Sequence, residues 1–393
     1  MVYLKKGVGV MTRKVAVVGI GHYGFRSVSP EVSFREMIYE SATRAYEDAG
    51  LEPMDIDGFV TAGEDWHEGH SIADEITPDQ LGAVKRPVFT VNGDAMHAFI
   101  SAYMHILTGQ MSICMVESRS KASNIVNSHE ITAMALDPIY NRPLEENPYF
   151  IAGLEMNRYL YESGNTREQC AQVVVKNKRN AMKNPNAGHG AKLDLEDILN
   201  SEAVSYPLTS LDISPHSDGC VVFILAEAEM ARTLSKNPIW IQGVGWCTET
   251  PSLERRDWGR SFCTRHASQM AYKMARINFP RKDIQFAEIS DEFSYKELQH
   301  MEDLNLCHRG EAGFLASEGA TDFDGDLPIN PSGGTLGVGN LQEANGALKI
   351  LEVVAQLRGE AGKRQLKDVK LGLAHTWRGL PTTSGAVVIL SNA

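Results

Sequence analysis

Short apolar runs alternate with longer amphipathic stretches along the first part of the chain. Residues 14–20 (KVAVVGI) form a continuous apolar run of strand length that is rich in β-branched residues. The next segment, up to Ala49, spaces its apolar residues at helical intervals, and Gly50 and Pro53 mark its end. A second apolar run follows in residues 55–63 (DIDGFVTAG). This pattern predicts a strand, a helix and a second strand.

The same order of elements returns in the second half of the chain. Residues 271–290 (AYKMARINFPRKDIQFAEIS) echo residues 45–60 (AYEDAGLEPMDIDGFV): each has a helix with an Ala-Tyr pair, a proline, an Asp-Ile pair and an apolar strand. In each half a helix and another strand follow, and the chain closes with the apolar residues 384–390 (SGAVVIL). This repetition predicts an internal duplication of an α/β unit.

A more polar, helical segment, from about residue 119 to residue 215, separates the two units. Strands that alternate with helices in both units predict right-handed βαβ connections and mixed sheets covered by helices. The expected fold class is therefore α/β, with five α/β/α/β/α layers and an inserted cap. The expected domains are an N-terminal half (1–118 and 216–255), an inserted loop or cap domain (119–215) and a C-terminal half (256–393).

The composition excludes several classes of partner. The chain has 393 residues, of which 43% are hydrophobic, and a formal net charge of −12. Nucleic acids and anionic membranes attract clustered Lys and Arg, so neither is an expected partner. No run of about 18 apolar residues is present, and the polar residues 1–14 do not resemble a signal peptide. Six scattered cysteines without a C-x-x-C pair favour a reducing cytoplasm.

Two motifs that suggest cofactors lack the context that would support them. Residues 19–24 (GIGHYG) follow a predicted strand, but the second strand ends in residues 60–63 (VTAG) without the acidic residue of a dinucleotide site. We interpret residues 19–24 as a Gly-rich turn and expect no nicotinamide cofactor. His67 and His70 are too closely spaced for a zinc-binding helix and have no further ligands nearby, so no metal is expected.

Several motifs, in the same order, resemble those of thiolases of the sterol-carrier-protein-X type, archaeal thiolases and the related lipid-transfer-protein aldolases. The segments that carry the resemblance are 216–227 (HSDGCVVFILAE), 288–293 (EISDEF), 301–313 (MEDLNLCHRGEAG), 327–334 (LPINPSGG), 337–346 (GVGNLQEANG), 356–362 (QLRGEAG) and 372–375 (GLAH). The resemblance implies the thiolase fold, a duplicated α/β unit with a loop domain in its first half. It also implies a coenzyme A thioester as the substrate.

The three catalytic positions that the resemblance locates all depart from the thiolase pattern. Counting back from Gly109, the position of the nucleophilic cysteine holds Asn92. The histidine of the family's H-D-x-F motif is matched by Ser290, and the histidine of its Gly-His pair is matched by Asn340, after Gly339. An amide is neither a nucleophile nor a general base, so this turn cannot form an acyl-cysteine.

A retro-aldol cleavage of a β-hydroxyacyl thioester does not need that nucleophile. It needs one base for the hydroxyl proton and hydrogen-bond donors for the enolate oxygen. We expect Asn92, Ser290 and Asn340 to shape this oxyanion site. Backbone N–H groups at the start of the helix after Asn92 would add a positive dipole end.

Three residues are candidates for the base. Glu292 and Asp291 lie in a loop that resembles the family's catalytic loop, and His375 follows a strand, in a loop that in the family faces the reacting carbon. The alternative for Asp291 is a structural role, holding its loop by hydrogen bonds to the backbone. Structural roles are also favoured for three neighbours: a helix N-terminal partner (Asp94), a buried histidine satisfied by the backbone (His97) and a packed tyrosine (Tyr295).

Coenzyme A binding is implied by the resemblance. Lys178 and Arg179, with Lys176 and Lys183, offer cations to the phosphates, although a solvated helix face explains them equally well. The glycine-rich loops should let the backbone approach the pantetheine arm; their predicted contacts are Ser332, Gly333, Gly334 and Gly339. A homodimer and a small zinc-ribbon/OB-fold partner protein are further implications of the family.

Three functions remain open. The first is a thiolase-like acyl-CoA enzyme that makes or breaks a carbon–carbon bond by aldol-type chemistry. The second is a non-catalytic subunit that binds acyl-CoA or scaffolds a partner enzyme. The third is an atypical Claisen thiolase with a displaced nucleophile, which the sequence disfavours because Cys114 lies in an apolar strand and Cys307 ends a helix away from the predicted chemistry.

Overall fold

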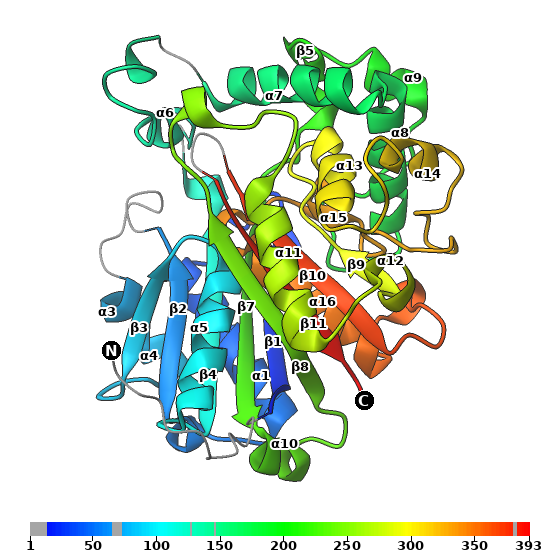
Figure 1. Cartoon of the computed structure of the whole chain (residues 1–393). Coiled ribbons are helices and arrows are strands. Elements are labelled where there is room, and N and C mark those ends of the chain that lie inside the picture. The colour runs from blue at the N-terminus through cyan, green and yellow to red at the C-terminus, as the bar shows by residue number, and fades with distance from the viewer. Residues whose placement is uncertain (1–13, 65–72, 126–127, 145–146, 380–382) are drawn as a thin grey trace, which may run out of the picture.

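The structure is a computed structural model that describes residues 14–64, 73–125, 128–144, 147–379 and 383–393 (Figure 1). Its main feature is a mixed sheet of nine strands, with the order β3-β2-β4-β7-β1-β8-β11-β10-β9. The strands are β1 (Val15–Arg26), β2 (Gly58–Gly63), β3 (Val88–Asn92), β4 (Ile113–Lys121), β7 (Asp218–Glu227), β8 (Ile239–Thr248), β9 (Phe286–Glu288), β10 (Leu371–Arg378) and β11 (Ser384–Ser391). A separate hairpin joins β5 (Ala203–Ser205) to β6 (Leu208–Thr209).

The sheet consists of two halves with the same topology. In the first half β2 is parallel to β4, which is antiparallel to β7, which is antiparallel to β1. In the second half β9 is parallel to β10, which is antiparallel to β11, which is antiparallel to β8. The predicted duplication is therefore confirmed. The halves meet between β1 and β8, which share two residue pairs, whereas β8 and β11 share eight. The second half of the sheet thus begins at Ile239, ahead of the predicted start at residue 256.

Helices cover both faces of each half and also lie between the halves. The helix α1 (Phe34–Ala49) packs on the outer face of the first half, and α11 (Phe262–Ala275) packs on the outer face of the second. Between the halves, α5 (Ala95–Thr108) and α16 (Asn345–Arg358) share one core with both inner faces. The predicted five α/β/α/β/α layers are confirmed.

Alternation along the strands explains these layers. Successive side chains of a strand point to opposite faces of the sheet. In β4, Val116 packs in the inner core and Met115 in an outer core. In β11, Val388 packs in the inner core and Val387 in the other outer core. Strands buried on both faces need a continuous apolar run, which is the pattern that the sequence contains.

A cap of helices lies beyond one end of the sheet (Figure 1). Its long helices are α7 (Pro148–Ser163) and α8 (Arg167–Ala181), and each begins at a polar N-cap whose side chain accepts a backbone N–H, Asn147 and Thr166. The helix α8 packs against α13 (Ser294–Asp303) and α15 (Gly334–Val338). The shorter helices are α3 (Ala73–Ile76), α4 (Pro78–Leu81), α6 (Ser128–Ala133), α9 (Leu195–Leu199), α10 (Ala228–Leu234), α12 (Pro280–Asp283) and α14 (Ala312–Ser317).

The glycines of residues 19–24 do not form the predicted turn. The strand β1 continues without a break to Arg26, so this prediction is wrong. The reason is close packing: a Cβ at Gly21 would lie 1.9 Å from the carbonyl oxygen of Ser41 on α1. Glycine here lets the helix approach the strand.

The sequence predicts neither a metal centre nor a membrane-spanning helix. No group of three His, Cys, Asp or Glu side chains among the described residues is arranged to hold a metal ion. His67 and His70 lie outside the described residues. No helix in that part of the chain combines the length and the apolar character that crossing a bilayer requires.

The inner core predicts one effect on stability. Phe99 on α5 is fully buried and meets Phe223 on β7 edge to face, with 5.5 Å between ring centroids. We expect Phe99→Ala to lower the free energy of unfolding by about 3–5 kcal/mol, because it leaves a cavity between the layers. Tyr161→Ala, at an 83% exposed position of α7, should change it by less than about 0.5 kcal/mol. Equal losses for both variants in denaturant titrations would contradict this layer assignment.

Candidate functional site

Four loops meet at the end of the sheet that lies beneath the cap. They are the turn between β3 and α5, the loop after β9, the segment between α15 and α16, and the end of β10. Asp94 joins three of these loops, because its Oδ2 accepts hydrogen bonds from Gly346 N (2.9 Å) and from Thr376 Oγ1 (3.0 Å). The two sheet halves therefore contribute to one site, at the carboxyl ends of parallel strands, where α/β proteins commonly bind ligands.

Glu292 is the titratable group of this site that is best suited to proton transfer. It is half-buried, and Asn345 Nδ2 donates a hydrogen bond of 3.3 Å to its Oε1. Burial raises the pKa of Glu292 to about 7; the Arg378 guanidinium opposes this shift, and Asp94 adds to it. A carboxyl group with a pKa near 7 can both accept and return a proton at neutral pH.

An amide chain connects Glu292 to Asn340. Asn345 Nδ2 also donates to Asn340 Oδ1 (2.9 Å), and Asn340 Nδ2 donates to Ser214 Oγ (3.1 Å). Gln342 N donates to the same Asn340 Oδ1 (2.9 Å). The structure thus brings Glu292 and Asn340 together, but the amide of Asn340 is already engaged within the protein.

The other two predicted oxyanion residues lie in different surroundings. Asn92 is the last residue of β3 and is exposed at the start of the turn into α5. Ser290 is buried: its N–H donates to His375 Nδ1 (3.4 Å) and its hydroxyl donates to the carbonyl of Trp377 (3.4 Å). Of the three predicted donors, Asn92 is the one that is exposed.

The turn at the start of α5 is fixed by Asp94. Its Oδ1 accepts a hydrogen bond from Met96 N (2.8 Å), which makes Asp94 the N-cap of α5 and confirms its predicted helix-terminal position. Burial raises the pKa of Asp94. Burial also lowers the pKa of His97, and His97 Nδ1 has no hydrogen-bond partner among the described residues. The backbone of Asp94 forms a hydrogen bond with the His97 ring, so the backbone contact predicted for this histidine stands on the Asp94 side.

Arg378 supplies the positive charge of the site. It forms ion pairs with Glu343 (3.2 Å) and with Glu64, and these acidic neighbours raise its pKa. Sequence reasoning missed both Arg378 and Asn345. The sequence marks both residues only indirectly. Arg378 stands three residues after the candidate His375, and Asn345 lies in the same motif as the candidate Asn340.

His375 lies in the core, where it is fully buried. Its Nε2 is 3.0 Å from Thr264 Oγ1, and its Nδ1 accepts the N–H of Ser290. Burial lowers the pKa of His375 well below its usual range, so the ring is neutral. A neutral ring with both nitrogens engaged favours a structural role for His375 over that of a base in contact with substrate.

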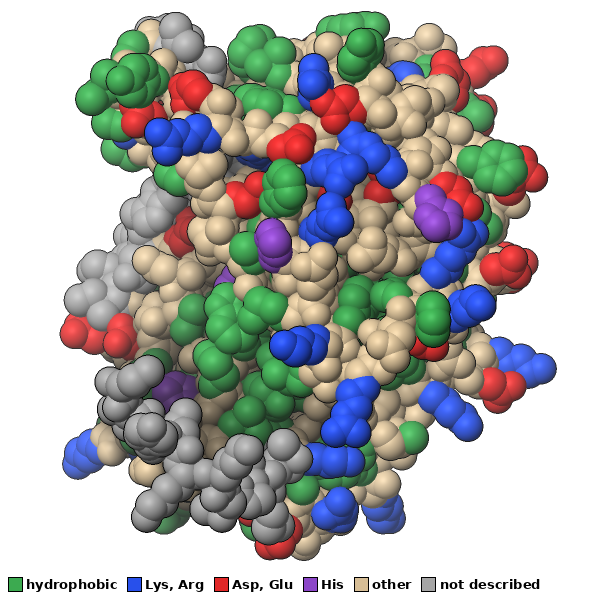
Figure 2. Space-filling model, viewed as in Figure 1, with side chains coloured by type: hydrophobic (Ala, Val, Ile, Leu, Met, Phe, Trp, Pro, Cys, Tyr) green, Lys and Arg blue, Asp and Glu red, His purple; other side chains and the backbone are tan. Residues whose placement is uncertain are grey.

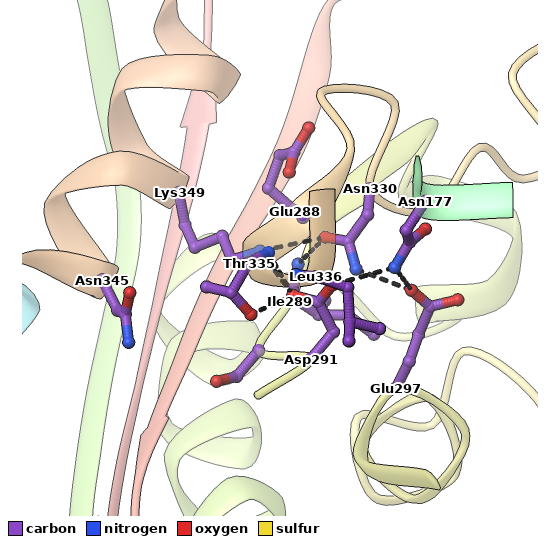
Figure 3. Close-up of polar contacts among 12 residues, drawn as sticks. Asn177, Glu288, Ile289, Asp291, Glu297, Asn330, Thr335, Leu336, Asn345 and Lys349 are labelled. Carbon is purple, nitrogen blue, oxygen red and sulfur yellow. Dashed lines mark hydrogen bonds and ion pairs between the residues drawn. The ribbon is translucent and has the colours of Figure 1, made fainter. Parts of the chain in front are cut away.

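Asp291 holds the loop after β9 in place (Figure 3). Its carboxylate accepts five hydrogen bonds, from Thr335 N (2.7 Å), Thr335 Oγ1 (2.7 Å), Leu336 N (3.2 Å), Asn177 Nδ2 (2.8 Å) and Lys349 Nζ (3.0 Å). These donors come from α8, α15 and α16. These contacts support a structural role for Asp291. The next residue, Glu292, remains the candidate base.

A second buried carboxylate, Glu297, extends this network. Lys176 Nζ donates to its Oε1 (2.5 Å), and Asn177 Nδ2 and Asn330 Nδ2 donate to its Oε2 (2.7 Å each). Figure 3 shows the side chains of Asn177 and Asn330 between Asp291 and Glu297. The network fastens α8 of the cap to the loops of the second half.

The residues predicted to contact pantetheine have packing roles. Ser332 donates through N (2.9 Å) and Oγ (2.7 Å) to the buried carboxylate of Glu288. Gly334 has a φ of +60°, and a Cβ there would lie 2.0 Å from Asp291 Oδ2. Gly333 packs against Ala181: a Cβ added at Gly333 would lie 2.5 Å from the Cβ of Ala181. Gly339, with a φ of +125°, packs on Ser217 in the same way. A contact of these residues with a ligand stays a prediction.

The cations of α8 and of the residues just after it are largely engaged within the protein. Lys178 is buried, and its Nζ donates to the carbonyl of Leu336 (3.0 Å). Arg179 forms a surface ion pair with Asp322 (2.7 Å). Lys183 lies over the ring of Phe323, with its Nζ 3.8 Å from the centroid. Binding of coenzyme A phosphates by Lys178 and Arg179 stays a prediction.

The cysteines of the chain are largely buried. All six lie in the described residues, none forms a disulfide, and five are buried. Burial raises the pKa of the Cys114 thiol to about 12 and raises that of Cys307 as well. Thiols with raised pKa values are poor nucleophiles at neutral pH, because the thiolate is the reactive form.

The chain resembles several acyl-CoA enzymes in sequence. Residues 246–392 match a family model described as thiolase C-terminal domain-like. Acetyl-CoA acetyltransferase of Methanothermobacter thermautotrophicus is 35% identical over 387 residues, which cover 96% of this chain and 100% of that protein. Sterol carrier protein 2 of Oryctolagus cuniculus is 26% identical over 391 residues (92% and 69% covered). The 17-hydroxy-3-oxo-4-pregnene-20-carboxyl-CoA lyase of Mycobacterium tuberculosis is 26% identical over 403 residues (95% and 99% covered).

The chain is also similar to solved structures of such enzymes. The Ltp2-ChsH2(DUF35) aldolase matches with a TM-score of 0.83 and 26% identity, over 96% of this chain and 98% of that chain. Human mitochondrial 3-ketoacyl-CoA thiolase matches with a TM-score of 0.75 and 14% identity, over 98% and 100%. Because only 14% of the residues are identical, the likeness to the human thiolase concerns the fold alone.

The buried Glu288 predicts a pH dependence of stability. Burial raises its pKa in the folded state to about 7, above its ordinary value of 4.5, and Glu352 adds to this shift. The folded state binds the proton of Glu288 more tightly than the unfolded state does. The contribution of this proton to the free energy of unfolding is therefore complete below about pH 4.5 and is lost as the pH rises through 7. The shift corresponds to about 3 kcal/mol.

We expect Glu288→Gln to flatten the dependence of unfolding free energy on pH between 5 and 8. Denaturant titrations at intervals of half a pH unit would measure it, with Glu360→Gln, at an exposed position, as the control. If wild type and Glu288→Gln showed the same slope, Glu288 would not titrate in this range.

Proposed function

Because this chain belongs to the thiolase superfamily of acyl-CoA enzymes, in the branch of sterol carrier protein 2, archaeal thiolases and the Ltp2 aldolase, we propose that it makes or breaks a carbon–carbon bond next to a coenzyme A thioester. The proposed chemistry is a (retro-)aldol reaction without an acyl-cysteine intermediate. The observation that supports the proposal is Glu292, whose pKa is raised to about 7 and which lies within the electrostatic influence of Asp94, the N-cap of α5.

In the cleavage direction, Glu292 takes the proton of the β-hydroxyl group of the substrate. The bond between the α- and β-carbons breaks, the β-carbon leaves as a ketone or an aldehyde, and the electron pair forms a thioester enolate. Hydrogen bonds from Asn92 and from the start of α5 stabilise the enolate oxygen, and each such donor contributes about 3 kcal/mol. The proton then passes from Glu292 to the α-carbon, which releases the shortened acyl-CoA.

The charges around Glu292 suit this proton transfer. Arg378 lies near enough to favour the ionised form, whereas burial favours the neutral form. The two influences leave the pKa near neutrality, which is the best value for a group that must act first as a base and then as an acid. A Claisen reaction would need a thiolate, and the cysteines have raised pKa values or lie buried in cores.

A non-catalytic subunit is the second candidate. The amide of Asn340 and the hydroxyl of Ser290 are both hydrogen-bonded within the protein, which leaves fewer donors for an oxyanion than predicted. The Ltp2-ChsH2(DUF35) aldolase also combines a similar chain with a second component. This neighbour supports the proposal of a heteromeric partner, while a homodimer, a small zinc-ribbon/OB-fold partner and a cytoplasmic location are proposed from the family resemblance alone.

A substrate panel separates these functions. Purified protein, alone and with a candidate partner, would be incubated with β-hydroxyacyl-CoA and β-ketoacyl-CoA thioesters of graded chain length. We expect a released ketone or aldehyde from the first group and no coenzyme A-dependent cleavage of the second. Cleavage of the second group alone would indicate a Claisen thiolase, and absence of any product with and without partner would indicate a non-catalytic subunit.

Glu292→Gln tests the assignment of the base. We expect kcat/KM for the cleaved thioester to fall by about 10²- to 10⁴-fold, because the amide cannot take the hydroxyl proton. The wild-type kcat/KM should rise with pH and level off above about 7, as Glu292 ionises. Glu360→Gln is the matched control, since it removes an exposed carboxylate. Unchanged rates in Glu292→Gln would exclude Glu292 as the base.

A further inference from the structure

A cluster of arginines stands out on the surface of this acidic protein. Four arginines occur within eleven residues around the start of α11: Arg255, Arg260 and Arg265 are at least partly exposed, whereas Arg256 is buried and pairs with Glu155. Figure 2 shows Lys and Arg side chains gathered on the face where α7, α11 and α13 lie in Figure 1. With a net charge of −12 for the whole chain, such a cluster is not expected from composition.

A small cavity is lined by two of these arginines, Arg260 and Arg265. Its volume is about 170 Å³, and it is lined by Arg260, Arg265, Glu302, Asp303, Asn305, Cys307, His308 and Arg309. In the described part of the chain, neither Arg260 nor Arg265 has a carboxylate within ion-pair distance. Arg309, in contrast, pairs with Glu162 on α7 (2.7 Å). Two half-buried guanidinium groups therefore face the cavity without a counter-ion in contact.

Two acidic groups, Glu302 and Asp303, also line the cavity. The carboxylate of Glu302 accepts hydrogen bonds from Tyr159, Asn165 and Gly310 N. Asp303, at the end of α13, is buried, and its Oδ2 accepts the N–H of Ser261 at the start of α11 (2.6 Å). Burial raises the pKa of Asp303 to about 7, and Arg260 and Arg309 oppose the shift. Near pH 7 the carboxyl group is therefore ionised in only part of the molecules, and it balances the arginines less than a fully ionised carboxylate would.

We propose that this cavity binds a phosphate-type dianion. The planar fork of Arg matches phosphate oxygens with paired hydrogen bonds, and the start of α11 adds backbone dipoles of the same sign. The volume is below the roughly 300–1,000 Å³ of pockets for drug-sized ligands, so it suits a single phosphate group.

The site is separate from the proposed acyl site. Glu292 lies two residues before the start of α13, and Asp303 is the last residue of this ten-residue helix. At 1.5 Å per residue, the helix places about 15 Å between the two groups. The phosphate belongs either to a free ion or to a phosphomonoester such as the 3′-phosphate of coenzyme A, and the test distinguishes these sources.

Calorimetric titration of the whole protein with inorganic phosphate, and with sulfate as a probe of fixed charge, tests the proposal. We expect binding to weaken at least about tenfold in the double variant Arg260→Gln/Arg265→Gln. We expect Asp303→Asn to tighten sulfate binding at pH 8 at least about fivefold, because it removes the competing negative charge. Arg281→Gln, which removes an exposed pair with Glu311, is the matched control.

Titrations with coenzyme A and dephospho-coenzyme A identify the source. If the double variant weakens coenzyme A but not dephospho-coenzyme A, the 3′-phosphate occupies the cavity; if it weakens neither, the ligand is a separate phosphate. Melting temperatures measured without phosphate would verify that each variant folds. Undetectable binding by the wild type at tens of millimolar phosphate, or equal affinity in the double variant, would overturn the proposal.

Discussion

The buried ion pair between Lys349 and Asp291 holds the parts of the site in one arrangement. Lys349 lies on α16, between the two halves of the sheet, and Asp291 lies in the loop after β9. Both side chains are almost fully buried. Removing one partner of such a pair leaves an uncompensated charge, which typically costs 3–5 kcal/mol. The position of Glu292, the next residue, therefore depends on an interaction in the core rather than on the surface loop itself.

This arrangement connects the duplicated fold to its chemistry. Each half contributes a helix to the middle layer, α5 or α16, and the loops at the start of both helices meet at Asp94 and Gly346. The reacting groups come from loops, while the residues that fix them come from the layers beneath. The network around Asp291 joins α8, α15 and α16, so the position of the loop after β9 is set by these helices.

Much of the fold was predictable from the sequence, because burial on both faces of a strand leaves a continuous apolar run and helices leave a longer period. The duplication could be predicted from the sequence for the same reason. The glycines of β1 were misinterpreted, since the helix that requires them, α1, starts several residues later and its approach cannot be seen in the sequence. In the site, Glu292 was found through its motif. Arg378 and Asn345 were missed, because their roles depend on partners such as Glu64 that are far away in sequence.

Intact-mass spectrometry of the protein during turnover of a β-hydroxyacyl-CoA tests the central claim most directly. Rapid acid quenching would preserve any acyl group bound to the chain. A site that works through proton transfer by Glu292 predicts that a ketone or an aldehyde accumulates while the protein keeps its unmodified mass at every time point. An added acyl mass on any cysteine, formed and lost at the rate of turnover, would contradict the account.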